Sequence, residues 1–331
     1  MKKTKVAING FGRIGRSTTR ILLQNESIEI VAINDLTENK TLSTLFKYDS
    51  IHGIFNGSVS SDDNSITIND KKIIVLNERD PEKLPWKNLG VDIVIESTGH
   101  FRTKELANKH ILAGAKKVIL SAPSKSEDIK TIVMGVNESK MDGSETIISN
   151  ASCTTNCAAP MIQLIDELCE IEAGFLSTIH SYTSDQNLHD APHTDLRRAR
   201  AAALSIIPTS TGAATAVGKI LPHLEGKIIG SAMRVPVPDG SLTELTLTVK
   251  NVKSVLEINE AFRKAVETKW KNIVSFNEDP IVSIDIVGNQ SSCIFDSTLT
   301  QVTGNTIKIC GWYDNEIGYS SRLVDLVNLL S

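Results

Sequence analysis

The segment 149–157, with the sequence SNASCTTNC, places the thiol of Cys153 at the predicted start of a helix. An apolar run ends just before it, and residues 154–168 carry apolar side chains at helical spacing. A thiol at a helix N-terminus lies among unpaired N–H groups and the positive end of the helix dipole, and both lower a cysteine pKa. A buried structural cysteine is the alternative, but the polar neighbours Ser152 and Thr154 favour a reactive thiol with a depressed pKa.

His180 is the candidate base for this thiol. It lies near the end of a strand-like run, residues 175–182 (FLSTIHSY). A histidine in such a position is as often structural as catalytic, but a cysteine candidate elsewhere in the chain makes it the preferred partner. The other histidines lie in predicted loops or helix flanks: His52, His100, His110, His189, His193 and His223.

A glycine-rich turn near the N-terminus predicts a dinucleotide site. A short apolar strand runs into Gly10-x-Gly12-x-x-Gly15, and a helical stretch follows. The first glycine permits a tight turn, the second lets the backbone approach a pyrophosphate, and the third lets the helix pack on the strand. A second apolar strand ends just before Asp35, at the spacing expected for the carboxylate that binds the adenosine ribose. A turn or cap residue is the alternative interpretation of Asp35.

A thiol combined with a dinucleotide supports aldehyde oxidation. The cysteine adds to the aldehyde to give a hemithioacetal, and loss of hydride to a nicotinamide gives a thioester. A phosphate acceptor or a phosphorylated substrate would also need anion sites. The candidates, each of which could instead be a helix cap or a solvated arginine, are Ser152, Thr154, Thr211, Gly212, Arg198 and Arg234.

Composition limits the possible classes of protein. A chain of 331 residues suits two domains, and 40% hydrophobic with 22% charged residues is ordinary for a globular protein. A net charge of −4 argues against nucleic acid or an anionic membrane as the main partner. The five cysteines do not resemble a disulfide framework and no secretory signal is evident, so a reducing cytoplasm is the expected setting. No Cys/His cluster has metal-ligand spacing, so no metal is expected.

The pattern of apolar residues changes between the two halves of the chain. Strands alternate with helices over residues 1–150, which predicts a parallel Rossmann-type sheet with ligands at the carboxyl ends of its strands. Residues 243–250 instead alternate strictly, and 281–287 and 306–312 are also strand-like. We therefore predict an α/β fold: a dinucleotide-binding domain over 1–150, joined by a C-terminal helix at 317–331, and an α+β catalytic domain with a mostly antiparallel sheet over 151–316.

The chain resembles the phosphorylating glyceraldehyde-3-phosphate dehydrogenases from end to end. The motifs that carry the resemblance are, in order, GFGRIGR, AINDLT, KYDSIHG, ERDP, ESTGHF, SNASCTTNC, HSYTSDQ, DLRRARAAA, IIPTSTGAA, MRVPVP and WYDNEIGYS. This resemblance implies oxidation of D-glyceraldehyde 3-phosphate with inorganic phosphate to 1,3-bisphosphoglycerate in glycolysis, with NAD as cofactor, by a cytoplasmic homotetramer. It further implies that the long cationic segment 183–203 lies beside the cofactor of a neighbouring subunit.

The same resemblance implies roles for individual residues. Cys153 matches the nucleophile of the family and His180 its base. Residues matching NAD contacts are Gly10, Gly12, Arg13, Ile14, Asp35, Arg79, Ser121 and Asn315, the last on the nicotinamide carboxamide. Residues matching the site of the attacking phosphate are Ser152, Thr154, Thr211 and Gly212, and those holding the substrate and its phosphate are Thr183, Arg198 and Arg234.

Several positions depart from the family pattern. Ile317 replaces a tryptophan, and Ala191 stands where strictly NAD-specific members often have leucine, which leaves NADP use open. The alternatives are an erythrose-4-phosphate dehydrogenase, an NADP-using gluconeogenic form, or a non-catalytic binding protein. The last would predict loss of the thiol or the base, and both are present.

Overall fold

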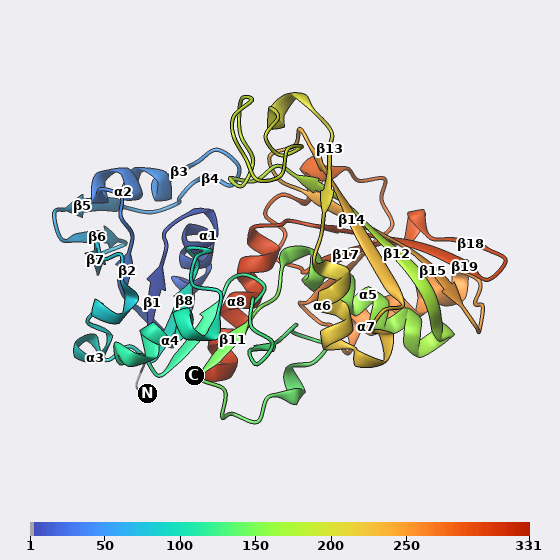
Figure 1. Ribbon diagram of the computed structural model, residues 1–331, viewed down its shortest axis with the longest axis horizontal. Coiled ribbons are helices and arrows are strands. Elements are labelled where there is room, and N and C mark those ends of the chain that lie inside the picture. The colour runs from blue at the N-terminus through green and yellow to red at the C-terminus, as the bar shows by residue number, and fades with distance from the viewer. Residues whose placement is uncertain (1–2) are drawn as a thin grey trace. The chain divides into compact units, whose positions relative to one another are not determined.

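The computed structural model describes residues 3–331 and divides the chain into two compact units. The first contains the chain up to Ile132 together with Ser139–Ala151 and Ser320–Ser331, and the second contains Val133–Glu138 and Ser152–Tyr319. Each unit is built on its own sheet (Figure 1). Among the helices formed by residues 3–331, none combines the length and the apolar composition that a bilayer crossing requires.

The first unit contains a nine-stranded sheet in the order β10-β11-β9-β8-β1-β2-β7-β6-β5. Neighbours from β10 to β7 pair in parallel, and β6 and β5 add an antiparallel edge. The strands are β1 (Thr4–Asn9), β2 (Ile28–Asn34), β5 (Val59–Asp62), β6 (Ser65–Ile68), β7 (Lys71–Leu76), β8 (Ile93–Glu96), β9 (Lys117–Leu120), β10 (Lys130–Thr131) and β11 (Ile147–Ser149). A separate short pair joins β3 (Tyr48–Asp49) to β4 (Gly53–Ile54).

Helices follow the central strands of this sheet, as the sequence pattern predicts. All four residues of β8 are buried, as expected for a parallel strand covered on both faces. The core between sheet and helices includes Trp86, Val94, Ala107 and Val118. The helices are α1 (Arg13–Leu22), α2 (Asn39–Lys47), α3 (Trp86–Leu89), α4 (Lys104–Leu112) and most of α8 (Ile317–Leu330). The predicted Rossmann-type sheet is confirmed.

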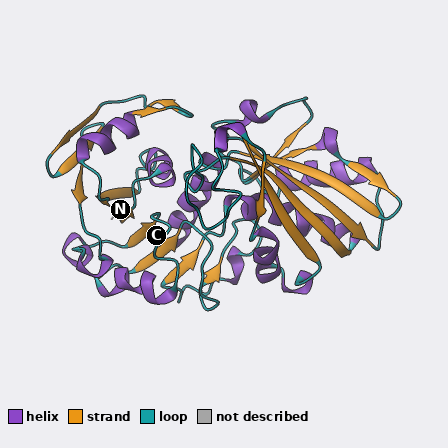
Figure 2. Cartoon of the chain, turned by 45° about the horizontal axis from the view of Figure 1, so that its top comes forward, coloured by secondary structure: helices purple, strands orange, loops and turns teal. Residues whose placement is uncertain are grey.

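The second unit contains an eight-stranded, mostly antiparallel sheet, whose long strands are drawn in orange in Figure 2. Its strand order is β13-β14-β12-β15-β19-β17-β16, with β18 paired to β19. The pairs β12–β14 and β16–β17 are parallel, and the other pairs described are antiparallel. The strands are β12 (Ile171–Ser181), β13 (Ile207–Ser210), β14 (Ile228–Val235), β15 (Ser241–Val249), β16 (Val274–Asn277), β17 (Cys293–Asp296), β18 (Gln301–Thr303) and β19 (Thr306–Tyr313).

A helical layer packs on one face of this sheet (Figure 1). The central helix α5 (Cys153–Cys169) contacts β12, β15, β17 and β19, and it also packs against α6 (Ala213–Ile220) and α7 (Val255–Glu267). Strict alternation on β15 explains this arrangement, because every second side chain faces the helices. The buried residues of that strand are Ser241, Thr243, Leu245, Leu247 and Val249.

The predicted strand at 281–287 is wrong. Residues Ser283–Ile286 form a 3₁₀ turn, although their apolar and polar side chains alternate. Val282 and Ile284 are exposed, and the Asp285 carboxylate accepts a hydrogen bond from the Val282 N–H at 2.8 Å. This local side-chain bond replaces a strand ladder, as aspartate often does at turns.

Candidate active site

The candidate site of the second unit lies where four strands of the sheet end beside the first residue of α5. His180 near the end of β12 is the direct neighbour of Arg234 on the parallel strand β14. Ser241 at the start of β15 pairs with Tyr313 at the end of β19. Thr178 and His180 are both buried and, being two residues apart on a strand, face the same side of the sheet.

Local geometry fixes the start of α5 at Cys153. The hydroxyl of Ser152 caps the helix by accepting a hydrogen bond from the Thr155 N–H at 3.1 Å. Ala151, just before the cap, has φ 56°, a left-handed conformation that costs a residue with a Cβ roughly 1–2 kcal/mol. The helix start predicted from the sequence is therefore present, and it places the thiol in the first turn.

The thiol of Cys153 and the imidazole of His180 are in contact. Sγ lies 3.4 Å from Nε2, within hydrogen-bond range for sulfur. Cys153 is partly exposed, whereas the other cysteines, which are Cys157, Cys169, Cys293 and Cys310, are buried. Cys157 is packed, as predicted, and its Sγ lies 3.5 Å from the Gly311 carbonyl oxygen. A thiol reagent is therefore expected to reach Cys153 first.

The other ring nitrogen of His180 lies between an acceptor and a donor. Nδ1 is 2.8 Å from the Ser181 carbonyl oxygen and 2.7 Å from Nη1 of Arg234, which also donates to that carbonyl at 2.8 Å. With its proton on Nδ1, the ring donates to Ser181, and Nε2 is free to accept the proton of Cys153. With its proton on Nε2, the ring accepts from Arg234 and donates to a thiolate. The surroundings of the ring therefore suit both states of the thiol.

Burial sets the protonation of the pair. Burial raises the pKa of the Cys153 thiol to about 11, while Arg234 and the Thr154 N–H act in the opposite direction. Burial, and after it the charge of Arg234, lowers the pKa of His180 to about 3. The depressed thiol pKa predicted from the helix start is therefore not found in this structure, because lost hydration outweighs the helix terminus and the arginine. Thiol and imidazole are both neutral near pH 7.

Removal of the Arg234 charge should raise the pKa of Cys153 further. A nearby cation stabilises the thiolate, so Arg234→Gln should move the pH profile of alkylation to higher pH. We expect alkylation at a fixed pH below the midpoint to slow by roughly three- to tenfold, because one pKa unit is a tenfold change in thiolate. Iodoacetamide labelling of Cys153 across pH 6–10 measures this. Arg234→Lys, which keeps the charge, is the matched control, and identical profiles for the Arg234→Gln variant and the original protein would contradict the expectation.

The hydroxyls predicted to bind anions have protein partners. Thr154 is buried, and its Oγ1 lies 3.0 Å from the Tyr313 hydroxyl, which in turn lies 2.8 Å from Oγ1 of Thr178. Thr211 accepts a hydrogen bond from the Ala213 N–H at 3.2 Å. Gly212 is the exposed N-cap of α6, and the first two residues of that helix, Ala213 and Ala214, are buried.

Arg198 is held by acidic neighbours. Its guanidinium forms ion pairs with Asp185 and Asp195 and donates to the Thr209 hydroxyl at 2.9 Å. Its charge still lowers the pKa values of His180 and Arg234, although the larger cause for both is burial. The structure therefore brings Arg198 to the same region of the second unit, with part of its charge already balanced.

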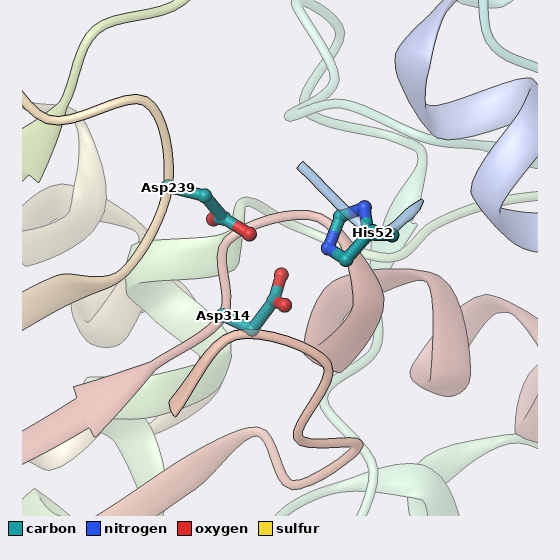
Figure 3. Close-up of side chains that lie close together, drawn as sticks. All are labelled: His52, Asp239 and Asp314. Atoms are coloured by element: carbon teal, nitrogen blue, oxygen red, sulfur yellow. The ribbon is translucent and has the colours of Figure 1, made fainter. Parts of the chain in front are cut away.

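Asn315 lies in the turn between β19 and α8. Asp314 fixes this turn, because its carboxylate accepts hydrogen bonds from the N–H groups of Glu316, Ile317 and Gly288 at 2.7–2.8 Å. The carboxylate of Asp239 lies within 4.8 Å of that of Asp314 (Figure 3), and it accepts from the Gly240 N–H at 2.8 Å.

In the first unit, the glycine-rich turn has the backbone that its sequence predicts. Gly10 has φ 93°, and an added Cβ would lie 2.7 Å from the Thr98 nitrogen. At Gly15 an added Cβ would lie 2.2 Å from the Gly10 carbonyl oxygen, which is the close helix–strand approach expected of the third glycine. Gly12 is exposed, and an added Cβ would meet no described protein atom within 4 Å. Protein packing therefore does not require glycine at position 12, whereas close approach of a ligand would.

The remaining cofactor candidates of the first unit lie at or near the carboxyl ends of its strands. Asp35 follows β2, and its carboxylate accepts hydrogen bonds from the N–H groups of Phe11 at 2.8 Å and Thr37 at 3.0 Å. Arg13 and Ile14 open α1 and are half-buried, Ser121 follows β9, and Arg79 is exposed beyond β7. Arg13 also forms an ion pair with Asp49 at 2.8 Å.

Sequence reasoning missed a buried polar network beneath these strand ends. Glu96, at the end of β8, lies 3.0 Å from Nε2 of His110 and accepts from the Asn9 amide at 2.5 Å. The Asn9 side chain accepts from Asn34 at 2.6 Å, and Trp86 donates to Nδ1 of His110 at 3.0 Å. The sequence around His110 did not indicate these contacts, because the partners lie far away in the chain, Glu96 at the end of β8 and Trp86 at the start of α3.

Two family models cover most of the chain. The glyceraldehyde 3-phosphate dehydrogenase NAD binding domain matches residues 4–104, and the glyceraldehyde 3-phosphate dehydrogenase C-terminal domain matches residues 152–315. The chain belongs to the glyceraldehyde-3-phosphate dehydrogenase family. Its first unit is accordingly the NAD-binding unit and its second the catalytic one, as predicted.

Curated relatives with this name extend over nearly the whole chain. The protein is 54% identical to the glyceraldehyde-3-phosphate dehydrogenase of Mycobacterium avium, with 98% of each chain covered. It is 56% identical to that of Streptomyces coelicolor, with 97% of each chain covered. It is also 54% identical to that of Geobacillus stearothermophilus, with 97% of this chain and 96% of the relative covered.

Proposed function

We propose that the protein oxidises D-glyceraldehyde 3-phosphate to 1,3-bisphosphoglycerate with NAD and inorganic phosphate, the glycolytic reaction, in the cytoplasm. The observation that carries this proposal is the contact of 3.4 Å between Sγ of Cys153 and Nε2 of His180 at the start of α5. Membership in the family and relatives named for this aldehyde support it over the erythrose 4-phosphate alternative.

Cys153 and His180 share the bond-making steps. Sγ forms a bond to the aldehyde carbon while the thiol proton passes to Nε2 of His180 and then to the carbonyl oxygen, which gives a hemithioacetal. His180 then accepts the hydroxyl proton. Bound NAD would supply the hydride acceptor for this carbon, and Cys153 would then carry a thioester. Attack by phosphate breaks the C–S bond, returns the proton to sulfur and releases the acyl phosphate.

The lowered pKa of His180 keeps the ring neutral. Because burial, and after it the charge of Arg234, disfavours the imidazolium, Nε2 is unprotonated and able to accept a proton when the reaction begins. Arg234 carries a positive charge beside the sulfur, and with Arg198 and Thr183 we assign it to the substrate and its phosphate. The N–H groups at the starts of α5 and α6, next to Ser152, Thr154, Thr211 and Gly212, are the groups we assign to the attacking phosphate.

The residues of the first unit fit NAD. The open position at Gly12 leaves room for a pyrophosphate at the start of α1, and Asp35 offers a carboxylate to the adenosine ribose. We further assign Arg13, Ile14, Arg79 and Ser121 to the cofactor, and Asn315 of the second unit to the nicotinamide carboxamide.

A kinetic assay tests the proposed function. NADH formation from D-glyceraldehyde 3-phosphate should depend on inorganic phosphate, and arsenate should replace phosphate as acyl acceptor. Erythrose 4-phosphate and NADP should give much lower kcat/KM in the same assay. Absence of NADH formation with phosphate, or a preference for erythrose 4-phosphate, would contradict the assignment.

Cofactor preference should depend on Asp35. A carboxylate accepts hydrogen bonds from the ribose hydroxyls and repels a 2′-phosphate. Asp35→Gly should therefore raise the KM for NAD and narrow the ratio of kcat/KM between NAD and NADP. Steady-state kinetics with both cofactors measure this ratio, and Asp63→Gly, in the exposed turn after β5, is the control. Equal kcat/KM for both cofactors in the original protein would mean that Asp35 does not set the preference.

We also propose that the protein is a homotetramer. On the sheet of the second unit, Phe175, Ile229 and Met233 of β12 and β14 are exposed. Leu188, Leu196, Leu204 and Ile206, in and just after the segment 183–203, are exposed as well. Large exposed apolar side chains gathered on neighbouring elements are typical of subunit interfaces, and a second copy of this chain is the occupant that the resemblance implies.

Arg197 should contribute to assembly. Arg197 is exposed within the segment 183–203, which also carries the exposed apolar side chains of Leu188 and Leu196. Arginine is the cation best suited to interface ion pairs, so Arg197→Glu should weaken the tetramer and lower cofactor affinity with it. Sedimentation velocity across micromolar concentrations measures assembly, and Arg263→Glu on α7 is the surface control. A fully active monomer would contradict the tetramer outright.

A further inference from the structure

Two buried serines orient the side chain of Asn315. The hydroxyls of Ser181 and Ser241 donate to Oδ1 of Asn315 at 2.7 and 2.8 Å. All three residues are buried, and both serines are fully so. Two hydrogen bonds satisfy both lone pairs of a carbonyl oxygen, so the amide is held with its oxygen toward the serines and its NH₂ group turned away from them.

The same two serines also support His180. The Ser241 hydroxyl accepts a hydrogen bond from the Ser181 N–H at 3.1 Å, while the Ser181 carbonyl oxygen lies 2.8 Å from both Nδ1 of His180 and Nη1 of Arg234. The main chain of Ser181 thus connects Ser241 to the base, through the N–H of one peptide group and the carbonyl of the next. The Ser241 hydroxyl accepts from the Ser181 N–H and donates its own hydrogen, for which Oδ1 of Asn315 at 2.8 Å is a nearer acceptor than Oγ of Ser181 at 3.4 Å.

We propose that Ser181 and Ser241 are positioning residues that tie the amide of Asn315 to the base His180. The Ser181 hydroxyl contacts the amide at 2.7 Å and the Ser241 hydroxyl at 3.4 Å, whereas the main-chain carbonyl of Ser181 contacts His180. The Ser241 hydroxyl serves both, through Asn315 directly and through the Ser181 N–H. This inference rests on the proposed function, in which the NH₂ group of Asn315 donates to the nicotinamide carboxamide.

The division of roles predicts different results for two serine substitutions. Ser181→Ala should raise the Kd for NAD by about two- to tenfold, the effect of one buried hydrogen bond, and leave the pH profile of Cys153 alkylation unchanged. Ser241→Ala should raise the Kd for NAD by a similar factor. It should also lower kcat and shift the alkylation profile, because the Ser181 main chain, whose carbonyl contacts His180, loses the hydrogen bond that its N–H makes to Ser241. With both hydroxyls removed, the loss of NAD affinity should approach that of Asn315→Ala.

Calorimetry compares the binding of NAD with that of ADP-ribose, which lacks the nicotinamide. The difference between the two ligands measures the contribution of the Asn315 side chain to nicotinamide binding. All four variants should bind ADP-ribose as the original protein does. Ser275→Ala on β16 is the matched control, because its buried hydroxyl has no hydrogen-bond partner among residues 3–331. This variant should leave the Kd values for both ligands, kcat and the alkylation profile unchanged.

The outcomes separate this inference from the proposed function. If Asn315→Ala weakens NAD binding but Ser181→Ala and Ser241→Ala do not, the proposal for the two serines is wrong, and the proposed function is unaffected. Equal loss of NAD and ADP-ribose affinity, or the same alkylation shift in both serine variants, would also overturn it. If Asn315→Ala leaves NAD binding intact, the assignment of Asn315 itself fails, while phosphate-dependent NADH formation by the original protein still tests the reaction independently.

Discussion

Replacement of Cys153 by serine is expected to reduce NADH formation by roughly 10⁴-fold or more, because a hydroxyl is a far weaker nucleophile than a thiol near pH 7. The contact with His180 cannot compensate, since the proton of an alcohol is much harder to remove. Binding of NAD should be unchanged, because the cofactor candidates of the first unit are untouched. Stopped-flow measurement of the first turnover, together with NAD titration, separates lost chemistry from lost binding.

Cys157→Ala is the control for this experiment. Cys157 lies one turn further along α5, is fully buried and contacts main chain rather than His180. Its substitution should lower stability slightly through a small cavity and leave kcat nearly unchanged. Comparable loss of turnover in both variants, or full activity of the Cys153→Ser variant, would remove Cys153 from the role of nucleophile.

Replacement of His180 by asparagine should slow turnover by about 10²–10⁴-fold, the usual contribution of a general base. Asparagine can still form a hydrogen bond with the thiol, but it cannot take up a proton. The KM for NAD should therefore change little while kcat falls. The pH dependence of kcat should also change, because proton removal from Cys153 would then rely on solvent and follow the high pKa of the thiol itself.

His223→Asn is the matched control for the base. His223 is exposed and lies 2.6 Å from the Asp166 carboxylate at the surface, an interaction that contributes little to stability. This variant should keep both kcat and its pH dependence. An unchanged kcat for His180→Asn would show that the contact with Cys153 is structural.

The sequence alone predicted the elements that carry the chemistry. The glycines of the first turn, the helix start at Cys153 and the alternation along β15 follow from neighbours within a few positions, and local rules suffice for them. Its position near a strand end made His180 the candidate base, and the resemblance to the family added Asn315. The turn at 283–286 was not predicted, because the Asp285 carboxylate accepts a hydrogen bond from the nearby Val282 N–H and an alternating pattern does not reveal such a bond.

Only the tertiary structure decided the protonation and the supporting contacts of the site. Cys153 and His180 are 27 residues apart in the chain, and Ser181 and Asn315 are 134 apart. Periodicity indicates which face of a strand a side chain occupies, but not which strand lies beside it or how much water reaches it. The raised pKa of Cys153 and the serine contacts of Asn315 are products of such long-range packing, since desolvation and hydrogen-bond partners depend on every element that closes around a group.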